Sequence, residues 1–185
     1  MGRRADIALK PTIYKFSLTL SDLDRNRYDT LNLTVARHPS ETAERMLVRV
    51  LAFCLNAEDG LVFSKGLSDS NEPALWSHTL DGQIASWIEV GEPSVDRIKK
   101  ATRLAQRVSV YCFNTRADVW WVQSAGALNS LGVGVFRFAW EEVQALESLL
   151  QRTMSLSVTI SERSIYVSDD QRTLELNVTQ LSGHR

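Results

Sequence analysis

Hydrophobic and polar residues alternate along the chain near both of its ends. The segments 12–20 (TIYKFSLTL) and 30–35 (TLNLTV) place an apolar residue at every second position. Three later runs repeat this pattern: MSLSVTI (154–160), SIYV (164–167) and LELNV (174–178). A period of two residues is typical of strands with one buried face. We therefore predict an N-terminal hairpin with a long polar connection and a C-terminal antiparallel meander.

The middle of the chain alternates between helical and strand patterns. Four segments favour helices: Ser40 to about Leu55, about Ser94 to Arg107, 116–125 and 140–152. Four others favour strands: 61–65, 84–90, 108–113 and 133–139. Such alternation indicates α/β topology with some parallel pairing. We expect a single domain over 1–185, with a mixed central sheet, flanking helices and additional antiparallel strands from both termini.

Composition narrows the possible classes of function. The 185 residues are 44% hydrophobic and 23% charged, as in ordinary globular proteins, and the formal net charge is -1. The chain as a whole therefore does not attract nucleic acid or anionic membranes, and any anion site must be a local cluster. The N-terminal segment lacks the apolar run of a secretory signal, and no window approaches the roughly 20 apolar residues of a membrane span. We expect no membrane contact and a cytoplasmic location, with Cys54 and Cys112 as buried thiols.

Glu44 is the first of three acids in unexpected positions. It lies in the middle of the apolar stripe of the first predicted helix, whereas Arg45 and Arg49 lie together on a different, polar side. A buried carboxylate requires a cation, a metal ion or several donors nearby. Two interpretations stay open: Glu44 reaches water or an arginine such as Arg37, or it belongs to a functional site.

Glu89 interrupts the apolar strand 84–90, directly before Gly91. Alternation predicts that Ile84, Ile88 and Val90 share one face of this strand. Glu89 then lies on the opposite face, where Gly91 leaves a vacancy. We expect a cation beside Glu89.

Asp81 is the third acid and precedes the same strand in an Asp–Gly turn. It is either a simple turn residue or a ligand. Carboxylates that converge at a sheet edge suit Mg²⁺ or Mn²⁺, which prefer oxygen ligands. The functional interpretation is that Asp81 and Glu89 bind the metal and that Glu44 supports the metal or its water.

Basic residues follow in the next predicted helix. Lys99, Lys100, Arg103 and Arg107 form one flank of it. The flank is either a solvated surface, with Asp96 paired to a lysine at helical spacing, or part of a site. The nuclease pattern PD…(D/E)xK favours a site. It requires a lysine two residues after the second acid, and here that residue is Gly91, which has no side chain. Lys99 or Lys100 could supply that lysine from the helix.

Long stretches of the chain resemble the YaeQ family of small bacterial proteins. They are KPTIYKFSLTLSDLDRNRY, ARHPSETAERMLVRVLAF, WIEVGEPSVDRIKKA and TMSLSVTI…IYVSDD…LELNVT. The resemblance implies a variant of the PD-(D/E)xK nuclease-like fold. It implies Glu44 on the leading helix, Asp81 and Glu89 as metal-binding acids, and Lys99 or Lys100 as the displaced lysine. Leu80 rather than proline precedes Asp81, and Thr79 stands where relatives carry an acid.

Two hypotheses follow. In the first, the protein is a Mg²⁺- or Mn²⁺-dependent nuclease or phosphodiesterase in which Arg103, Arg107 or Arg116 holds phosphate. In the second, it is a non-catalytic module that binds nucleic acid or a protein and keeps the nuclease fold, and its acids and bases form a buried ion-pair network. Trp120 and Trp121 either stack on bases or belong to the core. The oligomeric state stays open.

Overall fold

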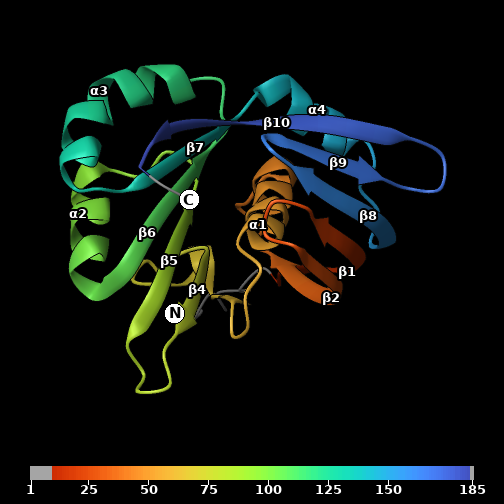
Figure 1. The fold of residues 1–185 in the computed structure, drawn as a ribbon, viewed down its shortest axis with the longest axis horizontal. Coiled ribbons are helices and arrows are strands. Elements are labelled where there is room, and N and C mark those ends of the chain that lie inside the picture. The colour runs from red at the N-terminus through yellow and green to blue at the C-terminus, as the bar shows by residue number, and fades with distance from the viewer. Residues whose placement is uncertain (1–9, 184–185) are drawn as a thin grey trace, which may run out of the picture.

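The computed structural model describes residues 10–183, which form one mixed sheet with helices around it (Figure 1). The strands are β1 (Thr12–Asp22), β2 (Arg27–Arg37), β3 (Val62–Phe63), β4 (Leu75–His78), β5 (Ile84–Val90), β6 (Ala105–Cys112), β7 (Gly134–Phe138), β8 (Thr153–Ser161), β9 (Ser164–Ser168) and β10 (Thr173–Ser182). The helices are α1 (Ala43–Leu55), α2 (Val95–Leu104), α3 (Ala117–Ser130) and α4 (Trp140–Glu147), with a short 3₁₀ helix at Gly66–Ser68.

The ten strands are ordered β2-β1-β8-β9-β10-β7-β6-β5-β4-β3. The predicted hairpin and meander are confirmed: β1 pairs with β2, and β8, β9 and β10 pair in succession, all antiparallel. The hairpin strands are longer than predicted, so residues 23–26 alone connect them. Parallel pairs join β5 to β6, β6 to β7 and β1 to β8. Because β10 also pairs with β7, both groups of strands belong to one sheet.

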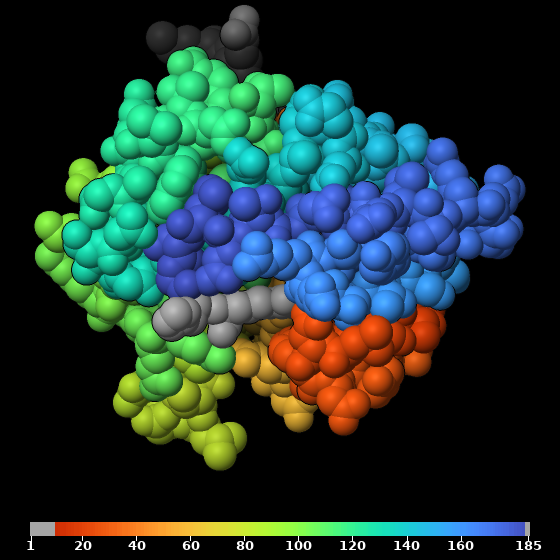
Figure 2. Space-filling view, turned by 45° about the horizontal axis from the view of Figure 1, so that its top comes forward, coloured from red at the N-terminus to blue at the C-terminus, as the bar shows by residue number. Residues whose placement is uncertain are grey.

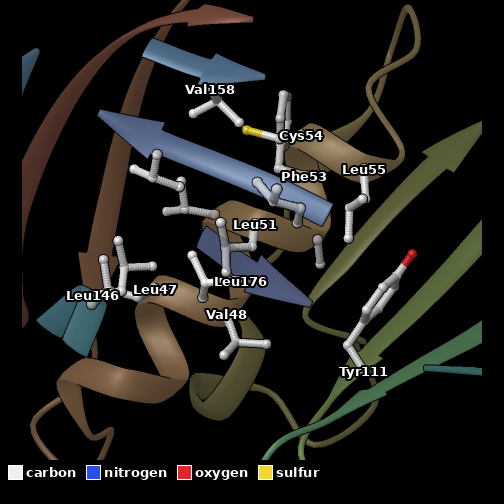
Figure 3. Close-up of a cluster of buried hydrophobic side chains, with 14 of the residues drawn as sticks. Leu47, Val48, Leu51, Phe53, Cys54, Leu55, Tyr111, Leu146, Val158 and Leu176 are labelled. Atoms are coloured by element: carbon white, nitrogen blue, oxygen red, sulfur yellow. The ribbon is translucent and has the colours of Figure 1, made fainter. Parts of the chain in front are cut away.

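The sheet curves around α1, which lies between its two halves in Figure 1. Every residue from Met46 to Leu55 is buried, as expected for a helix enclosed on all sides. Figure 3 shows Leu47 directed toward Leu146 of α4, and Cys54 directed toward Val158 of β8. Each such leucine stabilises the fold by about 1.5–3 kcal/mol through burial. We refer to the sheet face that contacts α1 as the inner face.

A second core lies on the outer face of β5, β6 and β7, beneath α2 and α3. Trp87, Ile98 and Val110 belong to it, whereas Ile88 belongs to the inner core. Ile84 packs with this outer core, so the predicted face of Ile84 is wrong. The register between β4 and β5 shifts between Ser86 and Ile84, and this bulge reverses the alternation.

Three further features bear on the sequence predictions. The helix α2 ends at Leu104, so Arg107 lies in β6 and not on the helix. Cys54 and Cys112 are buried free thiols, as predicted, and burial raises the pKa of both to about 12. No helix within residues 10–183 is both long enough and apolar enough to cross a membrane.

Candidate functional site: the acids, the basic flank and the Glu58 cavity

Glu89 is held by two donors at the end of β5. Its side chain lies on the outer face and the residue is 4% exposed. Its Oε1 accepts a hydrogen bond from Nε of Arg97 at 2.7 Å and another from Nε1 of Trp87 at 2.8 Å. A cation therefore does lie beside Glu89, but it is Arg97 of α2 rather than Lys99 or Lys100.

Arg97 extends this contact to a third segment of the chain. Its Nη1 donates to the backbone carbonyl of Ser70, and its Nη2 donates to the carbonyl of Glu72 at 2.8 Å. The planar guanidinium thus joins β5, α2 and the loop before β4, a geometry that the single ammonium of lysine cannot reproduce. The hydrogen bonds from Arg97 and Trp87 compensate the cost of burying the charge of Glu89. The carboxylate of Glu89 therefore stabilises the packing of these segments.

Gly91 explains why no lysine stands two residues after Glu89. Its φ is 109°, in the region that favours glycine, and its N–H donates to the carbonyl of Tyr111 at 2.9 Å. No heavy atom lies within 4 Å of the position that a Cβ would take. The backbone conformation, and not a shortage of space, therefore disfavours lysine at this position.

Asp81 lies far from Glu89, at the tip of the β4–β5 hairpin that protrudes at the lower left of Figure 2. Its carboxylate accepts hydrogen bonds from Thr79 Oγ1 and from Gln83 Nε2, and the first of these lowers the pKa of Asp81 the most. Asp81 precedes β5 and Glu89 is its penultimate residue, and a strand rises about 3.3 Å per residue. The two acids therefore cannot bind one ion, and Asp81 acts as a turn residue.

Glu44 is also separated from Glu89. It lies half-buried in the first turn of α1, and the core around α1 includes Ile88 and Val90 on the inner face of β5. Glu89 points to the outer face, toward α2. Within residues 10–183, no group of three or more histidine, cysteine, aspartate or glutamate side chains is arranged to hold a metal ion. The acids predicted from the nuclease pattern thus do not fit a shared Mg²⁺ or Mn²⁺ site.

The predicted basic flank is present on α2 for three of its four residues, since Arg107 lies in β6. Lys99, Lys100 and Arg103 are exposed, and their side chains form no hydrogen bond or ion pair with the described part of the chain. At 100° per residue, these three side chains span about 100° of the helix circumference. We refer to Lys99, Lys100 and Arg103 as the basic flank.

Arg116 and the tryptophan pair lie near the other end of α2. Arg116 is exposed and directly precedes α3. Trp120 donates from Nε1 to the carbonyl of Pro93 at 2.8 Å, which joins the start of α3 to the residues before α2. Trp120 and Trp121 pack against the outer core, which favours the core interpretation over stacking on bases.

Arg107 lines a cavity of about 530 Å³ at the N-terminal ends of β6 and β7. Glu58 lies at the centre of its polar groups. The Oε1 of Glu58 accepts from Ser77 Oγ at 2.7 Å and from Ser86 Oγ at 3.1 Å, and Oε2 accepts from Arg107 Nη2 at 2.9 Å. Burial raises the pKa of Glu58, but the bonds from Ser77, Arg107 and Ser86 together outweigh it, so this pKa lies below its usual value.

The cavity and the basic flank are adjacent. Thr102 and Gln106 line the cavity and are direct sequence neighbours of Arg103 and Arg107. Arg107 uses Nη2 for Glu58, and neither its Nε nor its Nη1 donates to a described residue. These groups, together with the flank, can bind anions at the mouth of the cavity.

Sequence reasoning missed Glu58, Arg97 and the two serines. Glu58 belongs to AEDG, which resembles a simple turn. A signal for the serines existed, since Ser77 and Ser86 are polar positions within apolar strands and are buried. The nuclease pattern specifies a lysine, so it contains no signal for Arg97.

Comparison with known proteins gives consistent matches over nearly the whole chain. The family model described as "YaeQ protein" matches residues 7–178. The YaeQ proteins of Escherichia coli (strain K12) and Salmonella typhi are each 40% identical over 175 residues, which cover 94% of this chain and 97% of each relative.

Two crystal structures are similar to the fold. The YaeQ protein from Xanthomonas axonopodis pv. citri has a TM-score of 0.91 at 33% identity, covering 94% of this chain and 99% of that one. The YaeQ protein from Pseudomonas syringae has a TM-score of 0.89 at 38% identity, covering 94% and 97%.

Proposed function

The chain belongs to the YaeQ family, and we propose that it is a nucleic-acid-binding module that keeps a nuclease-like core but uses its acids for structure. The observation that carries this proposal is the basic flank, whose cations are exposed and unpaired within the described residues beside the Glu58 cavity. Lysine and arginine side chains without acidic partners are the groups that neutralise phosphates and release counterions.

The order of elements supports a core of the PD-(D/E)xK type. A helix (α1), three antiparallel strands (β3, β4 and β5), a second helix (α2) and a parallel strand (β6) follow in this order. In such a core, Glu89 would be the second acid of the motif. Here Arg97 and Trp87 occupy its Oε1, and a divalent ion would have to displace a guanidinium that also binds two carbonyls. We therefore favour binding without cleavage.

The proposed interface has a defined extent. Phosphates of the nucleic acid contact Lys99, Lys100 and Arg103 along α2, and a further phosphate contacts Nε and Nη1 of Arg107, which donate to no residue in the range 10–183. The ion pair with Glu58 keeps Arg107 in position at the cavity mouth. Because phosphate contacts carry no sequence information, we expect binding with little sequence preference.

Fluorescence anisotropy with labelled single-stranded DNA, single-stranded RNA and duplex DNA tests the proposal. With four phosphate contacts, the logarithm of the affinity falls against the logarithm of salt with a slope of about -3 to -4. The double variant Lys99→Gln/Lys100→Gln should reduce this slope by about 2 and weaken binding at low salt by roughly tenfold or more. The matched control Lys15→Gln/Arg163→Gln removes two exposed cations elsewhere and should leave binding nearly unchanged.

Two results would contradict the proposal. One is the absence of binding to all three nucleic acids at low salt, and the other is equal binding by the flank variant and its control. Incubation with Mg²⁺ or Mn²⁺ tests the nuclease alternative in the same samples. Cleavage that requires the metal and disappears in Glu89→Gln would favour a metal-dependent nuclease over the binding module.

A further inference from the structure

A second cavity, of about 340 Å³, lies beside the start of α1 and is separate from the Glu58 cavity. The end of β2 and the segment 63–68 also line it. Its charged groups are Glu41, Arg45, Arg49 and Lys65, and His38 lies at its wall. Phe63 supplies part of an apolar wall.

Two arginines share the carboxylate of Glu41, the one carboxylate among the described residues that line this cavity. Oε1 of Glu41 accepts from Arg45 Nη1 at 2.6 Å and from Arg49 Nε at 2.8 Å, and Oε2 accepts from Arg49 Nη2 at 2.7 Å. Arg49 is 4% exposed and Glu41 is 5% exposed. Arg45 and Arg49 lie together on one polar side of the helix, as predicted, and Arg49 is in addition buried there against Glu41.

The charges that line the cavity do not balance. Among the described residues that line the cavity, three cations (Arg45, Arg49 and Lys65) face one carboxylate, an excess of two positive charges. The carboxylate of Glu72 lies outside this lining and accepts from the backbone N–H of Lys65 at 2.8 Å. Burial lowers the pKa of Arg49 below its usual value, Glu41 opposes this change, and the neighbouring Arg45 lowers the pKa further. A buried cation is stable when anions surround it, so a further anion would stabilise this arrangement.

Several donors remain for such an anion. Arg49 uses Nε and Nη2, and its Nη1 donates to no residue in the range 10–183. Nδ1 of His38 accepts from the backbone N–H of Ser40 at 3.2 Å and lies 2.7 Å from its Oγ, so Nε2 is the ring nitrogen without a bond within residues 10–183. Lys65, in the loop opposite α1, forms no side-chain bond within the same range.

We propose that this cavity binds a small phosphate monoester. The dianionic phosphate group matches the excess of two positive charges, and its oxygens can accept from guanidinium and ammonium groups on different walls. The organic part contacts Phe63. A volume of about 340 Å³ lies at the lower end of the range for small-molecule sites. This site is independent of the proposed nucleic-acid interface, since it involves α1, β2 and the segment 63–68 instead of α2.

Thermal unfolding with inorganic phosphate and with phenyl phosphate, at constant ionic strength, tests this inference. A ligand that binds the folded state raises the midpoint in a saturable way. Lys65→Gln and Arg45→Gln should each weaken phosphate binding by about tenfold, because each removes a charge-assisted donor. Lys65 is exposed, so its substitution leaves the fold intact. The matched control Arg163→Gln, in the exposed turn between β8 and β9, should bind phosphate like the parent protein.

The outcomes separate this inference from the proposed function. Loss of phosphate binding in Lys65→Gln, with nucleic-acid binding retained, supports the second site. An absent midpoint shift with phosphate, or equal affinity in the parent and both cavity variants, overturns it. An equal shift with the dicarboxylate succinate overturns the assignment to phosphate esters.

Discussion

Nε of Arg97 lies 2.7 Å from Oε1 of Glu89, and this ion pair joins α2 to the end of β5. The pair forms inside the turn between a strand and the helix that follows it, where Gly91 reverses the chain direction. A carboxylate that would serve as a metal ligand in a nuclease therefore stabilises the connection between two elements here. This pair also orients the exposed flank of α2, which is the surface that we propose binds nucleic acid.

Removal of Arg97 should destabilise the protein more than neutralisation of Glu89. Arg97→Met leaves a carboxylate buried without its cation, and the free energy of unfolding should fall by about 3 kcal/mol. Glu89→Gln keeps an acceptor for both donors, so the expected loss is about 1–2 kcal/mol. Urea denaturation measures both losses, and the double variant gives the coupling energy between the two side chains.

Lys99→Met is the matched control for Arg97→Met on the same helix. Lys99 is exposed and unpaired within the described residues. The free energy of unfolding of the Lys99→Met protein should therefore differ from that of the parent by less than about 0.5 kcal/mol. If Glu89→Gln instead abolished binding of Mn²⁺ without loss of stability, Glu89 would be a metal ligand and not a structural partner of Arg97.

Restoration of the motif lysine at position 91 should destabilise the fold. The φ of 109° is strained for any residue with a Cβ, so Gly91→Lys and Gly91→Ala should each cost about 1–3 kcal/mol. Gly126 provides the contrast, because it lies in α3 without a positive φ and Gly126→Ala should stabilise by up to about 1 kcal/mol. Equal stability of the Gly91 variants and the parent protein in urea would show that the turn does not require glycine.

The two thiols should react only when the structure opens. Burial raises the pKa of Cys54 and of Cys112 to about 12, so the reactive thiolate is scarce near neutral pH. We expect negligible modification by a disulfide reagent at pH 8 in native buffer and modification of both thiols in denaturant. Fast labelling of Cys112 alone in native buffer would mean that β6 opens locally.

The sequence predicted the strands at both ends well because one face of each is buried. In β1, the side chains of Tyr14, Phe16, Leu18 and Leu20 are buried, as the alternation requires. The parallel contact between β1 and β8 was not predicted, since it joins segments more than a hundred residues apart and no local pattern specifies it. The bulge between β4 and β5 likewise leaves no periodic signal.

The candidate site was predicted less well because a motif does not specify which side chains meet. Strand geometry alone separates Asp81 from Glu89, since an extended segment lies between them. The position of Glu44 relative to Glu89 depends on which face of the sheet α1 covers. That face in turn depends on the topology of the whole sheet. Arg97 reaches Glu89 through a long flexible side chain, which helical spacing does not specify.

The hydrogen bonds that Glu58 accepts from Ser77, Arg107 and Ser86 should make stability depend on pH. The folded protein lowers the pKa of Glu58 from its ordinary value of 4.5. A carboxyl with a lowered pKa contributes stability that is fully present above the unfolded value and is lost as the pH falls through the folded value. We therefore expect the free energy of unfolding to decrease below about pH 4.5, and Glu58→Gln should make this decrease smaller.

Arg107→Gln is the informative partner of Glu58→Gln. Without the guanidinium, Ser77 and Ser86 still donate to Glu58. The increase in pKa that burial causes is then compensated less, so the pKa of the carboxyl rises. The acid-induced loss should then begin at a higher pH than in the parent protein, because protonation of Glu58 occurs earlier. Urea denaturation between pH 3 and pH 7 checks both variants. Identical pH profiles for the parent protein and both variants would mean that this pair contributes nothing to folding, and Arg107 would then not be held at the cavity mouth.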